Sequence, residues 1–385
     1  MGDQELTPRT LSRAPALIGI RAVAIGLVIL VHTNVSVAEG GWIGVDVFFV
    51  LSGFLITALL LNEHDANGQF SIPKFYVRRI FRLVPAYWAF ILILVVWAAI
   101  WRSGAFGSWS SEAVKSATYQ MNFFDINHFP QIGIGQTWSL AIEEQFYLVW
   151  PLLLLVGLKF VSRRVFTGLV VIGILASFVA TVIMAHHGVS YRRLYYGLDT
   201  NALPLLVGCL AGILYTGGYV RKMSAQLSAF IPFVTVVVLA LFLISVPEQS
   251  EWAYEGPIQL VSLLTAATVF AILLNPDAWA AKILAHPWVV FIGLISYSLY
   301  LWNAFAMLLA RHLATGSVGR GLHLLVGVIL TFGFALASYY LVERPGLRLK
   351  DRFEVYRGGR REAASPAEPS HSRAPEFGDL HQASE

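Results

Sequence analysis

Long apolar segments recur along the whole chain and are separated by short polar connections. A helix that crosses a membrane needs about 17–25 mostly apolar residues. By that measure the sequence predicts ten transmembrane helices, over 15–37, 42–62, 83–101, 138–158, 165–185, 200–217, 227–246, 257–275, 287–309 and 321–342. The segments at 200–217 and 257–275 are short and flanked by polar residues, so a re-entrant segment is the alternative for these two.

The composition leads to the same fold class. Hydrophobic residues make up 57% of the 385 residues and charged residues 13%, whereas soluble proteins have about 45–50% and about 25%. The mean hydropathy is +0.65. So few charges cannot cover a water-exposed surface of this size. We therefore predict an all-α polytopic membrane protein with about ten transmembrane helices, in the plasma (inner) membrane.

The basic residues suggest an orientation. The net charge is +4, and most lysines and arginines fall in alternate connections and in the tail. Basic residues accumulate on the cytoplasmic side of membrane proteins, so both termini are predicted to be cytoplasmic. The predicted organisation is an N-terminal segment at 1–14, a transmembrane domain at 15–345 and a tail at 346–385. Proline, alanine, serine and charged residues dominate the tail, which is predicted to be largely disordered.

Two kinds of partner are not expected. The basic excess is explained by the cytoplasmic connections, so no nucleic-acid partner is predicted. The chain has a single cysteine, Cys209, within an apolar segment. A disulfide framework and a thiolate metal site are therefore excluded, and no metal is predicted.

The first predicted helix carries two ionisable residues, Arg21 and His32. Eleven residues of α-helix turn the chain through about 1100°, so both side chains lie on one face, roughly 16 Å apart along the axis. Ionisable groups inside membrane helices usually face a cavity or a pathway. The pair therefore predicts a functional stripe. The alternative is an arginine that reaches the headgroups and a histidine in an interhelical hydrogen bond.

Further acidic residues are predicted at the outer level of His32, namely Asp46, Glu143 and Glu144, with Asn303 at a similar depth and Asp199 at the outer end of the sixth predicted helix. A histidine beside a carboxylate is suited to take a proton from a hydroxyl group. Glu143 and Glu144 are adjacent and point about 100° apart, so only one is expected to face a cavity. The alternative is a set of interhelical hydrogen bonds that only stabilise the bundle.

At the inner level, Arg78, Arg79 and Arg82 precede the third predicted helix. Clustered arginines suit phosphate-rich ligands because a guanidinium can donate two parallel hydrogen bonds. Anchoring to anionic lipid, or the ordinary cytoplasmic excess of basic residues, is the alternative for this cluster.

Six segments, in order, resemble the motifs of the membrane acyltransferase-3 family. They are Arg21 and His32 with ten residues between them, then 44–56 (GVDVFFVLSGFLI), 78–87 (RRIFRLVPAY), 137–147 (TWSLAIEEQFY), 296–302 (SYSLYLW) and 342–345 (VERP). The resemblance covers about 14–350. One departure is Asn303, because the family often has a histidine after the late Tyr-Leu-Trp. That side chain is therefore expected only to form hydrogen bonds.

The resemblance implies transfer of an acyl group, usually acetyl, from acyl-CoA to a hydroxyl. The implied acceptor is a carbohydrate, either a cell-surface polysaccharide or glycolipid, or a glycosylated secondary metabolite such as a macrolide. Acetyl-CoA is the expected co-substrate, with membrane lipid around the protein. The family's donor-binding arginines match Arg79 and Arg82, with Arg78 beside them.

The resemblance also implies catalytic roles for four sites. His32 is expected to deprotonate the acceptor, with Glu143 or Glu144 as the supporting carboxylate. Arg21 is expected to stabilise negative charge on the thioester oxygen or on a CoA phosphate. Asp46 completes the predicted catalytic set.

Two other function classes stay open at this stage. Ten helices with charged residues inside them are also compatible with a transporter that exports a glycan or a lipid. A haem-linked redox protein is a third reading, because His32 and His323 both fall near the outer level.

Overall fold

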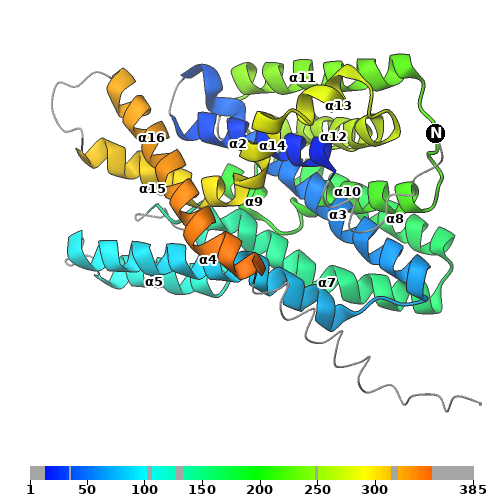
Figure 1. The fold of residues 1–385 in the computed structure, drawn as a ribbon, viewed down its shortest axis with the longest axis horizontal. Coiled ribbons are helices and arrows are strands. Elements are labelled where there is room, and N and C mark those ends of the chain that lie inside the picture. Colours follow the sequence, from blue (N-terminus) through cyan, green and yellow to red (C-terminus); the bar gives the residue numbers. More distant parts are fainter. Residues whose placement is uncertain are drawn as a thin grey trace, which may run out of the picture.

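The computed structural model describes residues 14–33, 36–101, 106–126, 133–247, 250–313 and 320–348. The predicted segment at 1–14 and the predicted tail at 346–385 lie almost wholly outside these ranges. Every regular element within them is helical (Figure 1). In chain order the elements are α2 (Pro15–His32), η1 (Ser36–Ile43), α3 (Gly44–Asn67), α4 (Ile72–Trp101), α5 (Phe106–Ala117), α6 (Met121–Asp125), α7 (Thr137–Phe160), α8 (Arg163–His186), α9 (Tyr191–Tyr196), α10 (Ala202–Thr216), α11 (Ala225–Ser245), η3 (Glu251–Glu255), α12 (Pro257–Leu274), α13 (Trp279–Leu284), α14 (Pro287–Leu294), α15 (Ser296–Leu313), α16 (Arg320–Ser338) and η4 (Tyr339–Glu343).

The predicted fold class, an all-α polytopic membrane protein, is confirmed. Within the described residues, eight helices are long and apolar enough to cross a membrane, and the bent pair α14 and α15 makes a ninth. The remaining predicted segment, 200–217, corresponds to α10, an apolar helix whose 15 residues fall short of a full span. Large apolar side chains remain exposed along these helices, as expected where lipid rather than water surrounds them.

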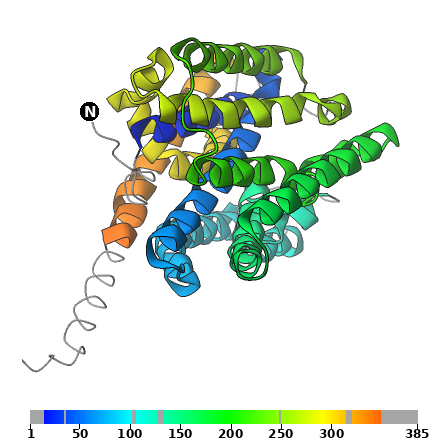
Figure 2. The same ribbon diagram turned by 90° about the vertical axis from the view of Figure 1, so that its right-hand side faces the viewer.

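Helix α3 lies in the middle of the bundle. Figures 1 and 2 show α11 and α12 on one side of the molecule and α4 and α7 on the other, with α2 and α3 between them. The largest helix–helix contact joins α3 to α10. Glycines make it close, because a Cβ on Gly53 would lie 2.0 Å from the Leu205 carbonyl oxygen, and one on Gly208 would lie 2.1 Å from that of Val50. Small residues at such crossings let membrane helices approach each other.

Helix α4 begins 11 residues earlier than the sequence predicts, at Ile72 instead of 83. The backbone N–H of Phe75 already donates to the Ser71 carbonyl at 3.0 Å, and Ser71 Oγ accepts from the Lys74 N–H at 3.4 Å. The hydropathy pattern missed this start because arginine is polar yet a good helix former. As a result, Arg79 and Arg82 are fixed on a helix that packs in the bundle, and do not lie in a loop before it.

A sharp break separates α14 from α15 at Ile295, where the two axes differ by 66°. Gly293 packs its backbone against α2, and a Cβ there would lie 2.0 Å from the Ile18 carbonyl oxygen. The break therefore brings the first residue of α15, Ser296, against α2.

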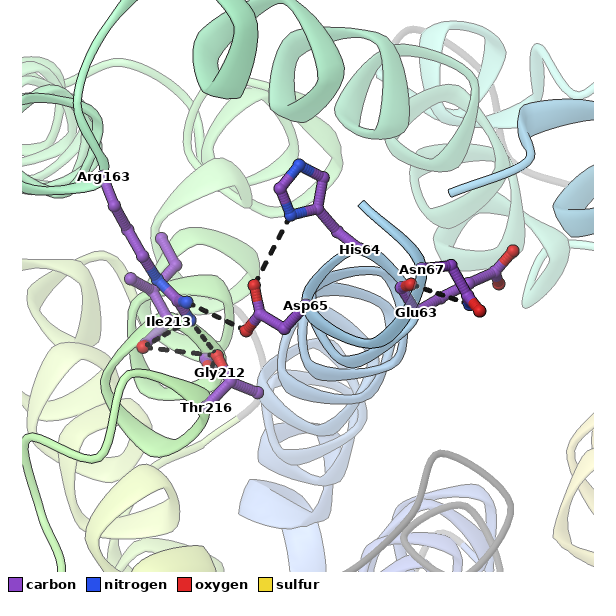
Figure 3. Close-up of polar contacts among 8 residues, drawn as sticks. All are labelled: Glu63, His64, Asp65, Asn67, Arg163, Gly212, Ile213 and Thr216. Carbon is purple, nitrogen blue, oxygen red and sulfur yellow. Dashed lines mark hydrogen bonds and ion pairs between the residues drawn. The ribbon is translucent and has the colours of Figure 1, made fainter. Parts of the chain in front are cut away.

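A cluster of polar contacts joins the end of α3 to α8 and α10 (Figure 3). Arg163, at the start of α8, forms an ion pair with Asp65 at 3.1 Å and donates to the Ile213 carbonyl oxygen at 3.3 Å and to the Thr216 hydroxyl. Since Asp65 is 45% exposed, the ion pair contributes only about 0–1 kcal/mol. Its main effect is to fix the ends of three helices relative to one another.

The close approach of α3 and α10 gives a stability prediction. Gly208→Ala should lower the free energy of unfolding by about 1–3 kcal/mol, because the new methyl group overlaps the Val50 carbonyl and must separate the helices. Thermal unfolding of the purified protein in detergent measures this change. The matched control is Gly168→Ala in α8, where a Cβ meets no atom within 4 Å. Equal midpoints for the two variants would show that the contact is not tight.

Candidate active site

A cavity of about 220 Å³ lies between α2, α3, α4, α7, α14 and α15. Much of its lining is apolar, from residues such as Leu17, Phe48 and Leu55. The charged and hydroxyl-bearing side chains that reach it include Arg21, Ser52, Arg79, Arg82, Glu143 and Ser296. Arg82 is exposed, so it marks the end of the cavity that is open to the surroundings. Buried charges that converge on a cavity from several membrane helices indicate a functional site.

Arg79 is bound on several sides by residues of α7. Its Nε donates to Glu144 Oε1 at 3.1 Å, and its Nη2 lies 3.9 Å from Glu143 Oε2. Its guanidinium carbon also lies 3.1 Å from the centre of the Tyr147 ring. A guanidinium stacked on an aromatic ring and paired with carboxylates is held in one orientation. Arg79 therefore links α4 to α7.

The two adjacent glutamates have different partners. Glu143 lines the cavity and accepts a 2.6 Å hydrogen bond from Ser52 Oγ of α3, whereas Glu144 binds Arg79 outside the lining. This agrees with the expectation that only one faces the cavity. The predicted depth of the two glutamates differs from the structure, which places them beside Arg79 and not beside His32. Since α4 starts early, its arginines lie beside α7 in the bundle instead of below it.

Arg21 approaches the cavity from α2. Its Nε donates to Ser296 Oγ at 3.2 Å, and its guanidinium carbon lies 6.0 Å from the centre of the Phe48 ring. Among the described residues, neither Nη group of Arg21 makes a hydrogen bond, and Arg82 donates none. A guanidinium with unused donors in a cavity is suited to bind an anionic ligand. Arg21 and Arg82 therefore have this capacity, while Arg79 is largely occupied by its glutamates.

Glu343 lies beside these two arginines, although the sequence analysis gave it no role. It ends the short π-helical turn η4, is only 4% exposed, and accepts a 3.0 Å hydrogen bond from Ser298 Oγ. Arg82 and Arg21 are the cations that interact with it electrostatically. π-Helical turns are frequent at functional sites. Its place in the VERP motif was the available signal, as motif membership also was for Ser52 and Ser296.

His32 is the last residue of α2 and does not line this cavity. Its Nδ1 lies 2.7 Å from the Val28 carbonyl oxygen. Because a carbonyl can only accept, Nδ1 carries the proton, and the neutral ring keeps its lone pair on Nε2. Among the described residues no carboxylate lies within ion-pair distance of His32, so the backbone, and not the expected glutamate, orients the ring.

The other predicted residues lie elsewhere. Asp46 is buried near the start of α3 in a separate pocket, and Arg78 forms an ion pair with Glu63 at 3.1 Å. Asn303 donates to the Leu299 and Tyr300 carbonyl oxygens of its own helix. Asp199 lies in the α9–α10 connection, where two hydrogen bonds from Arg193 hold its pKa below the usual range. In the described part of the chain, no three histidine, cysteine or acidic side chains are grouped to hold a metal ion.

Comparisons with known proteins place this geometry in context. A family model described as an acyltransferase domain matches residues 15–340. The chain is 33% identical over 348 residues to a protein of Staphylococcus aureus (strain COL) named as a candidate O-acetyltransferase. The matched region covers 86% of this chain and 57% of that protein. It is also 33% identical over 345 residues to the peptidoglycan O-acetyltransferase OatA of Listeria monocytogenes, covering 86% of this chain and 55% of OatA.

The chain thus spans just over half the length of these relatives. No solved structure matches it significantly.

The position of Glu343 gives a testable prediction. Glu343→Leu removes an acceptor of Ser298 and a carboxylate that interacts electrostatically with Arg21 and Arg82, so we expect a loss of about 1–3 kcal/mol in the free energy of unfolding. Glu343→Gln keeps an acceptor for Ser298 and should lose less. Thermal unfolding in detergent separates the two, with the exposed Glu251→Leu as the control. Equal stability of both Glu343 variants and the wild type would contradict the assignment.

Proposed function

The chain belongs to the acyltransferase family whose domain model it matches, and on this premise we propose that it transfers an acetyl group from acetyl-CoA to a hydroxyl of a carbohydrate. The observation that carries the proposal is the cavity in which Arg21 and Arg82 keep unused donors beside the Ser52–Glu143 pair.

The donor is assigned to this cavity. Acetyl-CoA carries several phosphates, and guanidinium groups bind phosphate oxygens through charge-assisted hydrogen bonds. Exposed Arg82 lies where a large anionic donor can approach, and Arg21 lies deeper. The volume of about 220 Å³ is below the roughly 300–1,000 Å³ of sites that enclose a drug-sized ligand. The cavity therefore accommodates only a part of the donor and not the whole molecule.

The chemical step exchanges one bond for another. The acceptor oxygen attacks the thioester carbon, a C–O bond forms as the C–S bond breaks, His32 Nε2 takes the hydroxyl proton, and the CoA thiolate leaves and recovers a proton from the imidazolium. Arg21 binds a phosphate of the donor, the other role expected for it, because the reacting thioester lies at His32. Since Arg21 and His32 are roughly 16 Å apart along α2, the acetyl group must reach beyond the arginine cavity, on an extended arm of the donor.

The acceptor class follows the relatives. OatA is named for peptidoglycan, so we propose a cell-surface glycan as the acceptor and the plasma membrane as the location. A glycosylated small molecule is the other acceptor that an assay should include.

Arg82 tests donor binding. Arg82→Ala should raise the KM for acetyl-CoA about tenfold with little change in kcat, because a hydrogen bond to a charged group contributes about 1.5–3 kcal/mol and solvent screens part of it at this exposed position. The assay is CoA release by protein in lipid vesicles. Arg164→Ala, which removes an exposed arginine of α8, is the control. An unchanged KM in Arg82→Ala would rule out this role. Arg78 belongs to the same sequence motif as Arg82, but it pairs with Glu63 and does not line the cavity. Arg78→Ala should therefore leave the KM for acetyl-CoA unchanged.

His32 tests the chemistry. His32→Ala should lower kcat about 10²–10⁴-fold, the range for losing a general base, while the protein still folds in the membrane. His312→Ala is a close control, because the His312 ring lies at the end of α15 and contacts its own helix in the same way, through Nδ1 and the Leu308 carbonyl at 2.9 Å. Mass spectrometry of the glycan detects the added acetyl group. Full transfer by His32→Ala would overturn the assignment, and glycan movement without consumption of acetyl-CoA would favour a transporter.

A further inference from the structure

A second, smaller pocket lies between η1, α3, α7, α8, α10 and α12. It is about 10 Å³ in volume, and its walls include Trp42, Asp46, Trp138 and Gln259. That volume is about one water-sized sphere. The Phe49 ring of α3 packs against the Trp138 ring of α7, with ring centroids 6.3 Å apart. Phe49 lines the cavity that contains Arg21 and Arg82, whereas Trp138 lines this smaller pocket.

Several polar side chains of this pocket already have hydrogen-bond partners. Thr181 Oγ1 donates to the Ser177 carbonyl oxygen at 2.7 Å, and Thr200 Oγ1 donates to that of Leu194 at 2.6 Å. Asn201 Nδ2 donates to the Tyr195 carbonyl at 2.8 Å. These groups stabilise the surrounding helices and do not require a ligand.

Two groups have no such partner among the described residues, and a third, Asp46, has no basic partner. The Trp42 indole N–H is buried without an acceptor, and Gln259 Oε1 is buried without a donor, although Gln259 Nε2 donates to the Tyr254 carbonyl at 2.9 Å. Asp46 is 6% exposed and has no basic group within ion-pair distance. A buried polar group without a partner costs about 1–3 kcal/mol, and a carboxylate costs more. Two such groups beside a buried carboxyl, all around one pocket, therefore indicate a ligand.

The types of the three groups define the chemistry of that ligand. The indole N–H can only donate, so it cannot bind a metal cation. Gln259 Oε1 accepts, and so does an Asp46 carboxylate, so an anion is disfavoured. A group that accepts one hydrogen bond and donates others satisfies all three side chains. Hydroxyl groups and water have this property, and water is the largest whole molecule that the volume admits.

We propose that Trp42, Asp46 and Gln259 form a hydroxyl-binding site, filled by water in the free protein and by a hydroxyl of the carbohydrate acceptor when that is bound. The second part rests on the proposed function. Asp46 precedes Ser52 by six residues on α3, so the site lies roughly 9 Å along the helix from the Ser52–Glu143 pair. An oligosaccharide carries several hydroxyls, so one can bind here while another is acetylated at His32.

The indole protons of ¹⁵N-tryptophan-labelled protein in detergent test the proposal directly, because hydrogen bonding moves an indole N–H resonance downfield. Trp42→Phe identifies the Trp42 signal. Trp302 is the matched reference, because its Nε1 is equally buried and without a partner but borders neither cavity. We expect a downfield, hydrogen-bonded Trp42 signal and an upfield Trp302 signal. A Trp42 signal at the Trp302 position would overturn the proposal.

Two further measurements separate the two sources of the hydroxyl. Asp46→Leu should shift the Trp42 signal toward that of Trp302 and lower the unfolding midpoint, while Asp46→Asn, which keeps an acceptor oxygen, should do less. Adding an N-acetylglucosamine pentamer should shift the Trp42 signal and leave that of Trp302 in place. An unmoved Trp42 signal would refute the acceptor part. The free-protein signal requires no catalysis, so it holds even where the proposed acetyl transfer fails.

Discussion

The Arg79 guanidinium lies inside the helix bundle, where an unpaired charge would cost several kcal/mol. Glu144 at 3.1 Å, Glu143 at 3.9 Å and the Tyr147 ring offset that cost. The same contacts hold α4 against α7 and turn Glu143 toward Ser52 of α3. Three walls of the cavity therefore depend on one arginine and its acidic partners, and the other polar residues of the site are placed relative to them.

Because Arg79 is paired with Glu143 and Glu144, the two other arginines of the cavity, Arg21 and Arg82, are the ones available to a ligand. Arg21 keeps both Nη groups without a protein partner, and Arg82 donates to no described residue. Glu343 lies next to both and is held by Ser298. The buried Glu343 carboxylate lowers the electrostatic cost of holding Arg21 and Arg82 close together while the cavity is empty. It accepts no hydrogen bond from either arginine, so their donors remain available to a ligand. Such a balance suits a site that must be stable both before and after an anion binds.

The apolar pattern was sufficient for the fold class, because lipid requires about 20 apolar residues per span whatever lies on the far side of the helix. It could not show that α4 begins at Ile72, since the first turns are basic, or that α14 and α15 meet at a 66° break that depends on contact between Gly293 and α2. The candidate site could likewise be predicted only in part. Depth along single helices grouped Glu143 with His32, whereas the packing of α4 against α7 groups it with Arg79.

The proposed function requires an anionic donor and a neutral acceptor to bind within one small bundle. The arginine cavity opens at Arg82. Its unused guanidinium donors favour phosphate, but they do not exclude an uncharged ligand. The pocket at Asp46 offers one N–H and acceptor oxygens, which favour a hydroxyl and exclude phosphate. Because α3 contributes Ser52 to one and Asp46 to the other, a rigid helix keeps the two chemistries apart at a fixed distance. Selectivity for each substrate then follows from the polar residues that surround each space, and α3 fixes the distance between the two.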